Sequence, residues 1–220
     1  MNNKSSKKAR RLVAALATAL CWGAGAVSAQ TLEIGGLTLQ QQGFADQWIS
    51  GSGSFTTNAA SPAAALTDAD LATWVRSDTP GASVVLAFTN NRVVNGVGDD
   101  IALFEVGHEA YEYSQEGFDS LWITINGQTR LYFTTETTTI VDDHNVNMTR
   151  LDLSHFGLAA GAQIDRIQIG LDYDTRGSLP QLQLVAAIHS VAAPVPEASS
   201  WALLLAGLAG LSGVARWRRR

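Results

Sequence analysis

An apolar residue at every second position is the feature that most constrains the fold of this chain. The run 121–125 alternates Leu, Ile and Ile with Trp and Thr, and such alternation indicates a strand with one buried face. Asn126-Gly127 follows, and a second run continues over 128–134. Because both residues of this dipeptide accept a positive φ, Asn-Gly between two such runs predicts a β-hairpin with a type I′ turn.

The same pattern recurs between residues 30 and 191. Alternating or continuous apolar runs occupy 32–39, 83–88, 101–106, 164–171 and 182–188. TTETTT at 134–139 adds the β-branched residues of an exposed strand, and only 59–72 and 153–162 have helical character. Many short strands separated by Gly, Asn and Asp predict one all-β domain over 30–191, an antiparallel β-sandwich or jelly roll.

The charge distribution limits the partners of this domain. All the lysines and half of the arginines lie near the two ends, which leaves six arginines against nineteen acidic residues over 30–195, a net charge of −13. An acidic surface repels phosphate backbones, so nucleic acid is excluded as a partner, whereas divalent cations are suited to it. The only cysteine, Cys21, lies in the N-terminal apolar run, so the domain itself has no disulfide.

Residues 1–29 have the three parts of a secretory signal peptide. A basic segment over 1–11 precedes an apolar segment over 12–24, and Val27-Ser28-Ala29 places small residues at the −3 and −1 positions. The apolar segment is short for a bilayer. We therefore expect export by the Sec machinery and cleavage between Ala29 and Gln30. The alternative is an N-terminal anchor or a core helix.

The C-terminus has a second apolar segment, preceded by a linker over 192–200. Residues Trp201 to Ala215 are uncharged and are followed by a basic tail containing Arg216, Arg218, Arg219 and Arg220. These fifteen residues are fewer than the roughly 20 that a bilayer requires. The arginines would hold the tail on the cytoplasmic side. The pattern predicts a marginal membrane helix in the inner membrane.

Val195-Pro196-Glu197-Ala198, the apolar helix and the basic tail together resemble the PEP-CTERM sorting signal. Members of that family are exported bacterial proteins, processed by a membrane protease called an exosortase, and tend to occur where extracellular polysaccharide is made. The resemblance implies transient anchoring in the inner membrane, then transfer to the cell surface or extracellular matrix. Ala198 departs from the family, which has a second proline there. A permanent tail anchor is the alternative.

The stretch Leu66 to Trp74, LTDADLATW, resembles the Asp-Gly-Asp-x-x-Thr-x-Trp loop of discoidin-like, galactose-binding-type jelly rolls. The resemblance implies a structural calcium ion held by Asp68, Asp70 and Thr73, whose oxygens are the ligands that a hard cation prefers. Ala69 stands where the family has glycine, and 181–190 lacks the expected acid. The alternative is an Asp-rich turn. The stretch 88–107 also resembles a strand–loop–strand of secreted jelly rolls that carry this tail.

Candidate ligand-binding residues are aromatic. Trp48, Trp122 and Tyr132 are candidates for stacking on sugar rings, with packing in the core as the alternative. No HExxH or GxSxG motif occurs among the histidines and serines, so no catalytic residue is assigned.

These features together predict an exported, surface-sorted, non-enzymatic protein associated with extracellular polysaccharide or a biofilm. Two alternatives stay open. One is a carbohydrate-binding module with a defined glycan site, and the other is a matrix-associated hydrolase that uses a pair of carboxylates.

Overall fold

The structure is a computed structural model that describes residues 31–110, 119–171 and 179–193. The expected signal peptide, the sorting motif and the membrane helix lie outside these residues. Within the described ranges no helix is long and apolar enough to cross a membrane. The fold is an all-β sandwich of antiparallel strands, as the alternating pattern predicts.

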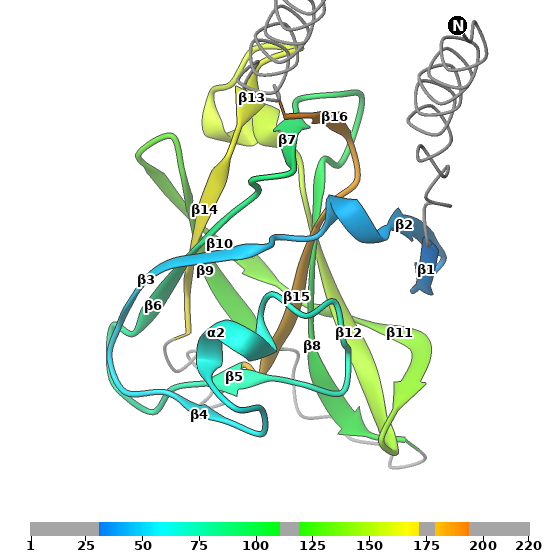
Figure 1. The fold of residues 1–220 in the computed structure, drawn as a ribbon, viewed down its shortest axis with the longest axis vertical. Coiled ribbons are helices and arrows are strands. Elements are labelled where there is room, and N and C mark those ends of the chain that lie inside the picture. Colours follow the sequence, from blue (N-terminus) through cyan, green and yellow to red (C-terminus); the bar gives the residue numbers. More distant parts are fainter. Residues whose placement is uncertain (1–30, 111–118, 172–178, 194–220) are drawn as a thin grey trace, which may run out of the picture.

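Two large sheets form the sandwich (Figure 1). The five-stranded sheet has the order β10 (Gln128–Phe133), β9 (Ser120–Ile125), β14 (Arg166–Gly170), β6 (Ser83–Ala87), β3 (Gln47–Ser52). The six-stranded sheet has the order β11 (Thr135–Val141), β12 (His144–Leu151), β8 (Ile101–Glu109), β15 (Leu182–Ala187), β5 (Val75–Arg76), β4 (Thr56–Thr57). Strands far apart in the chain therefore lie side by side.

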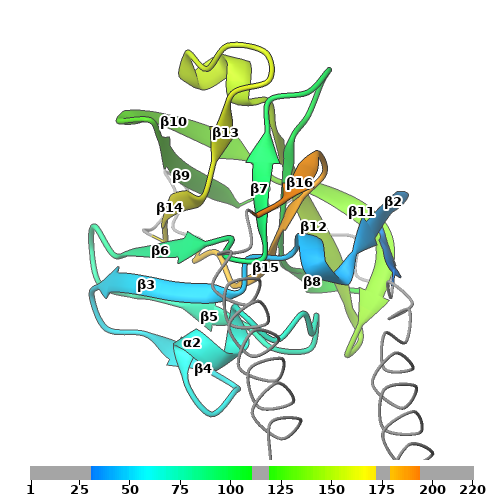
Figure 2. The ribbon, with the colours of Figure 1, turned by 45° about the horizontal axis from the view of Figure 1, so that its top comes forward.

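Two smaller sheets complete the fold. The hairpin β1 (Thr31–Ile34) and β2 (Leu37–Gln40) lies beside the six-stranded sheet, and β13 (Gln163–Ile164), β7 (Asn91–Val94) and β16 (Ser190–Ala192) form a sheet at one end of the sandwich (Figure 2).

The two faces of the large sheets differ in burial. Leu86 and Ile123 of the five-stranded sheet pack against Leu103 of the six-stranded sheet in the main core. The opposite face of the six-stranded sheet is also buried, since Phe104 packs there in a second cluster with Ile34 of β1. Burial of both faces explains why 101–106 and 182–187 have nearly continuous apolar runs. The five-stranded sheet is buried on one face only.

The turns follow the sequence pattern. Ile125 of β9 pairs with Gln128 of β10, and the intervening Asn126 and Gly127 have φ of 51° and 71°. This geometry confirms the predicted two-residue hairpin, because both central residues of a type I′ turn need a positive φ. The exposed strand predicted over 134–139 is β11, at the edge of its sheet.

The helical segments are shorter than predicted over 59–72 and 153–162. The first is only α2 (Pro62–Ala65), for which Ser61 is the N-cap, and the second is η3 (Leu153–Phe156), a 3₁₀ helix. η2 (Gln41–Gly43) is another 3₁₀ turn. Gly157 ends η3 in a left-handed conformation with φ of 72°, as glycine commonly does after a helix.

Candidate functional site

The outer face of the five-stranded sheet carries exposed apolar side chains. On β9, Leu121 and Ile123 point into the core, so Trp122 points outward and is 46% exposed. Leu131 of β10 pairs directly with Trp122. Phe133, two residues further along β10 and therefore on the same face, is 55% exposed. Residues in such diagonal positions are within reach of each other. We call Trp122, Leu131 and Phe133 the aromatic platform.

Next to the platform, the sheet carries a glycine and then a row of polar side chains. Gly170 of β14 pairs with Trp122, and a Cβ atom at Gly170 would lie only 3.0 Å from the Trp122 Cβ. Glycine therefore keeps the floor beside the indole low. In the next row, Gln168 pairs with Thr124, and its amide donates to Ser83 Oγ over 3.2 Å. An apolar ring thus adjoins a row of amide and hydroxyl groups.

An open groove lies beyond the polar row. It has a volume of about 570 Å³, and the polar side chains of Arg92, Asn126, Asp165 and Arg166 line part of it. Arg92 Nη1 lies 2.5 Å from Asp165 Oδ2, and Arg166 Nε lies 3.1 Å from Asp165 Oδ1. The hydrogen bond from Arg166, with a further contribution from Arg92, lowers the pKa of Asp165 below its usual value against the opposing effect of burial. The carboxylate therefore orients two guanidinium groups at the groove.

The other candidate aromatics have different surroundings. Trp48 packs against the core and makes an edge-to-face contact with Phe55, with ring centroids 5.5 Å apart. Tyr132 points to the inner side of β10 and stacks on Phe156, with centroids 6.0 Å apart. Burial raises the pKa of the Tyr132 hydroxyl. Among these three candidates, Trp122 alone is on the open face.

Sequence reasoning missed the other two members of the platform. Leu131 and Phe133 belong to the predicted hairpin, and the register of a two-residue turn places them on the same face as Trp122. Extending the alternation of β9 through the Asn-Gly turn would have identified them.

The loop from Leu66 to Trp74, which we call the Asp68 loop, gathers oxygen atoms around Thr73. The hydroxyl of Thr73 lies 3.0 Å from the carbonyl oxygen of Ala65 and 3.1 Å from that of Asp70. It also lies 3.1 and 3.2 Å from the two carboxylate oxygens of Asp68. A hydroxyl has only one proton to donate, so these oxygens cannot all be satisfied by Thr73. Their convergence fits a hard cation such as calcium.

The remaining groups of the loop are consistent with this fit. Ala69 has a left-handed φ of 56°, the conformation for which the similar loops have glycine. The carboxylate of Asp70 accepts a hydrogen bond from Ala72 N at 2.9 Å, so Asp70 would offer its carbonyl oxygen. Gln183 of β15 donates to the Leu71 carbonyl oxygen, and its buried Oε1 has no hydrogen-bond partner. That oxygen lies in the strand where the discoidin-like jelly rolls, which this loop resembles, have an acidic residue.

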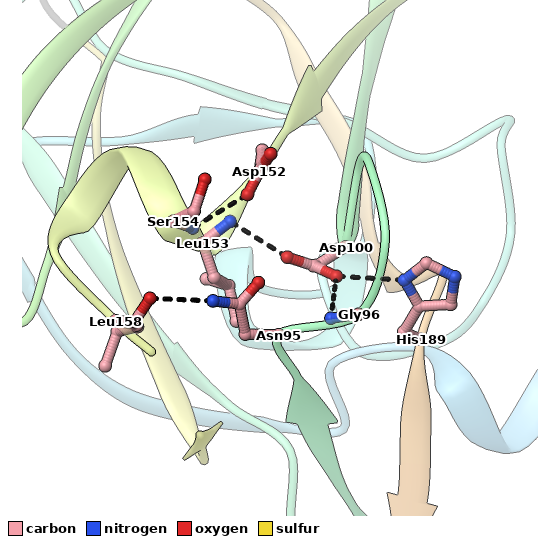
Figure 3. A network of polar contacts seen from close by, with 8 residues as sticks. All are labelled: Asn95, Gly96, Asp100, Asp152, Leu153, Ser154, Leu158 and His189. Carbon is pink, nitrogen blue, oxygen red and sulfur yellow. Dashed lines mark hydrogen bonds and ion pairs between the residues drawn. The ribbon is translucent and has the colours of Figure 1, made fainter. Parts of the chain in front are cut away.

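A second polar network joins the loops at the end of the sandwich where the three-stranded sheet lies (Figure 3). Asp100 is fully buried, and its Oδ1 accepts hydrogen bonds from Gly96 N at 2.7 Å and from His189 Nδ1 at 2.9 Å. Its Oδ2 accepts one from Leu153 N at 2.9 Å. Because two of the three donors are main-chain groups, we interpret Asp100 as a structural hub.

Across residues 31–110, 119–171 and 179–193, no three His, Cys, Asp or Glu side chains gather as a metal-binding group. A transition-metal centre built from such ligands is therefore not found in that part of the chain. This finding does not concern cation sites that are built largely from carbonyl and hydroxyl oxygens.

The family model of the PEP-CTERM protein-sorting motif matches residues 194–220. No curated protein is similar to this chain. Among solved structures, the chain is similar to a mutant of CBM29-2, a family 29 carbohydrate-binding module, with 14% identity and a TM-score of 0.33 over 74% of this chain and 93% of that one. It is also similar to the catalytic domain of a GH87 alpha-1,3-glucanase in complex with nigerose, with 14% identity and a TM-score of 0.32. That match covers 70% of this chain and 30% of the glucanase chain.

The sorting motif indicates an exported protein that is anchored in the membrane through its C-terminus before an exosortase processes it.

Proposed function

We propose that this chain is a non-enzymatic, surface-sorted protein that associates with extracellular polysaccharide through the open face of its five-stranded sheet. The observation that carries this proposal is the aromatic platform, where Trp122 and Phe133 are 46% and 55% exposed on one face. Exposed apolar patches of this kind mark interaction sites.

The chemistry of the face matches that of a sugar. A pyranose ring has apolar C–H faces and hydroxyl groups around its edge. The Trp122 indole offers a flat apolar surface, and Thr124 and Gln168 offer hydrogen-bonding groups in the next row. Gly170 leaves the floor beside the indole unobstructed. One sugar ring on Trp122 would therefore place its neighbour over the polar row.

The groove defines a preference within this class of ligand. Arg92 and Arg166 converge on Asp165 at its edge, and guanidinium groups bind carboxylates with two parallel hydrogen bonds. Residues 30–195 carry a net charge of −13, so two arginines held side by side form a locally basic site on an otherwise acidic domain. A saccharide that carries carboxylates would place its acidic group there.

The route to the surface is part of the proposal. The chain would enter the Sec machinery through residues 1–29, lose that segment after Ala29, and be cut by the exosortase near Pro196-Glu197. It would then act at the cell surface or in the biofilm matrix.

The proposal is tested by binding to a panel of neutral and uronate-containing polysaccharides immobilised on a glycan array. We expect Trp122→Ala to weaken binding about tenfold or more, a loss of about 1.4 kcal/mol. The melting temperature should change little, because the indole points outward. Trp74→Ala is the matched control, since Trp74 lies in the Asp68 loop and contacts Arg76. Equal binding by the wild-type and Trp122→Ala proteins, or no binding to any glycan, would contradict the proposal.

A further inference from the structure

Of the four edge strands that the described residues give the two large sheets, only one has a regular and unprotected edge. β11 and β3 each contain a register shift, between Glu136 and Ile140 and between Trp48 and Ser50. β4 is only two residues long. Bulges and short strands are devices that keep the edge of a sheet from pairing with another chain. β10, by contrast, lies at the outer edge of the five-stranded sheet (Figure 2) and keeps one register over all six of its residues.

The outer edge of β10 presents main-chain groups that β9 does not use. Thr134 N, directly after β10, donates to Asp119 O over 2.9 Å. Because bonded positions alternate along an antiparallel pair, the even-numbered residues of β10 are the ones that bond to β9. The N–H and C=O groups of the odd-numbered residues Thr129, Leu131 and Phe133 therefore point away from β9. No strand within the described residues pairs with them on that side.

The residues of β10 also lack the usual protection of an edge. The strand has no proline or lysine, and Arg130 is its one charged residue. Arg130 belongs to the inner face, where its guanidinium lies 6.0 Å from the centre of the Phe156 ring. The Phe133 carbonyl oxygen accepts a long hydrogen bond of 3.4 Å from Thr149 Oγ1, and a carbonyl oxygen has a second lone pair. β10 therefore has the features of a strand that pairs with another chain.

We propose that β10 pairs antiparallel with β10 of a second copy of this chain, so that two five-stranded sheets join into one. The outward main-chain groups are symmetric about Leu131. When Leu131 pairs with the partner's Leu131, Thr129 lies opposite the partner's Phe133, and each of these residues meets an outward N–H and C=O group of the other copy. Arg130 then lies opposite the partner's Tyr132, so no two like charges face each other across the pair.

A second copy fits this edge because the pattern of β10 is complementary to itself. Copies also meet at high local concentration, since the sorting motif anchors each of them in one membrane before processing. A single strand edge is smaller than the roughly 1,200–2,000 Å² that stable complexes bury, so the pairing should be weak and reversible. The outer faces of the two joined sheets lie on one side, which brings two aromatic platforms together. The pairing itself does not depend on whether the platform binds a saccharide.

Cysteine cross-linking of the full chain in detergent micelles, without any saccharide, tests the proposal. Cys21→Ser provides the background, because Cys21 is the only cysteine of the chain. Hydrogen-bonded residues of an antiparallel pair have Cα atoms about 5.5 Å apart, within the roughly 4.4–6.8 Å that a disulfide spans. Leu131→Cys should therefore form a covalent dimer under mild oxidation, seen on a non-reducing gel. Thr138→Cys, at an exposed position in the middle of β11, is the matched control and should give at least about fivefold less dimer.

Further variants separate the proposed register from chance contact within a micelle. Thr129→Cys alone should give little dimer, whereas Thr129→Cys combined with Phe133→Cys should give as much as Leu131→Cys. Thr129→Pro removes an outward N–H and leaves the pairing of β10 with β9 intact, so it should lower the dimer yield of Leu131→Cys about fivefold. Equal yields from Leu131→Cys and Thr138→Cys, no dimer from Leu131→Cys, or a yield that Thr129→Pro leaves unchanged would overturn the proposal.

Discussion

The buried carboxylate of Asp100 provides the sharpest test of how the loops at one end of the sandwich are held. Its two oxygens accept three hydrogen bonds from groups that belong to three segments, Gly96, Leu153 and His189. Its main chain is also bonded, because Asp100 N donates to Leu151 O and Asp100 O accepts from Ile188 N. The substitution Asp100→Asn keeps the shape of the side chain and the main-chain bonds. It replaces one acceptor oxygen by an NH₂ group.

The expected loss follows from this geometry. If the carbonyl oxygen of the new amide replaces Oδ1, its NH₂ group faces the Leu153 N–H, and two donors meet in a site with no exposure. If the amide is flipped, the conflict moves to Gly96 and His189. Hydrogen bonds to charged groups contribute about 1.5–3 kcal/mol, and an unsatisfied buried donor costs about 1–3 kcal/mol. Asp100→Asn should therefore lower the free energy of unfolding by about 2–4 kcal/mol.

Urea unfolding followed by tryptophan fluorescence measures this loss. With a urea dependence of about 2 kcal/mol/M, the midpoint should fall by roughly 1–2 M. Asp99→Asn makes the same chemical change one residue earlier, at a partly exposed side chain, and should cost less than about 0.5 kcal/mol. If the two variants unfold at the same urea concentration, Asp100 is not a structural hub and the reasoning is refuted.

Three further outcomes are expected. The pKa of Asp165 is lower in the folded protein than its ordinary value of 3.8, so the contacts of its carboxylate with the arginines contribute their full stability above pH 3.8 and lose it as the pH falls through the folded-state pKa. Asp165→Asn should therefore flatten the acid side of a plot of unfolding free energy against pH. Asp78→Asn, at an exposed position, should leave that plot unchanged. Chelation by EDTA should lower the melting temperature of the wild-type protein more than that of Asp68→Asn, and an equal effect on both would remove calcium from the Asp68 loop. Peptide mapping of mature surface protein should find no peptide beyond about Glu197, and recovery of the intact Arg220 terminus would favour a permanent anchor.

Much of the fold follows from local sequence. Strand β9, the Asn-Gly turn and β10 were all predictable, because alternation and turn chemistry act over neighbouring residues. Residues 101–106 were harder to interpret, since a strand buried on both faces loses its alternation. The helical character of 59–72 was misleading because Asp68 and Asp70 bond to main-chain N–H groups of their own loop, which competes with helix formation.

The candidate sites depend on contacts that sequence distance conceals. The exposure of Trp122 follows from the alternation of buried and outward-facing residues along β9. Its neighbour Gly170, however, belongs to β14, a strand much later in the chain. Glu105 interrupts the apolar run 101–106, yet the hydrogen bond that it accepts from Asn147 depends on the pairing of β8 with β12. A sequence pattern indicates which face of a strand is buried, but the sheet topology determines which residues of other strands that face contacts.

The unequal burial of the two large sheets also has an evolutionary consequence. In the central strands β8, β12 and β15 of the six-stranded sheet, most substitutions disturb a packed layer, whichever way the side chain points. On the five-stranded sheet, by contrast, every second residue can vary without disturbing the core, as Trp122, Thr124, Gln168 and Arg166 illustrate. A lineage of such proteins could therefore exchange the outer face of one sheet and retain the other. Ligand preference would then diversify with little loss of stability, on a scaffold that changes slowly.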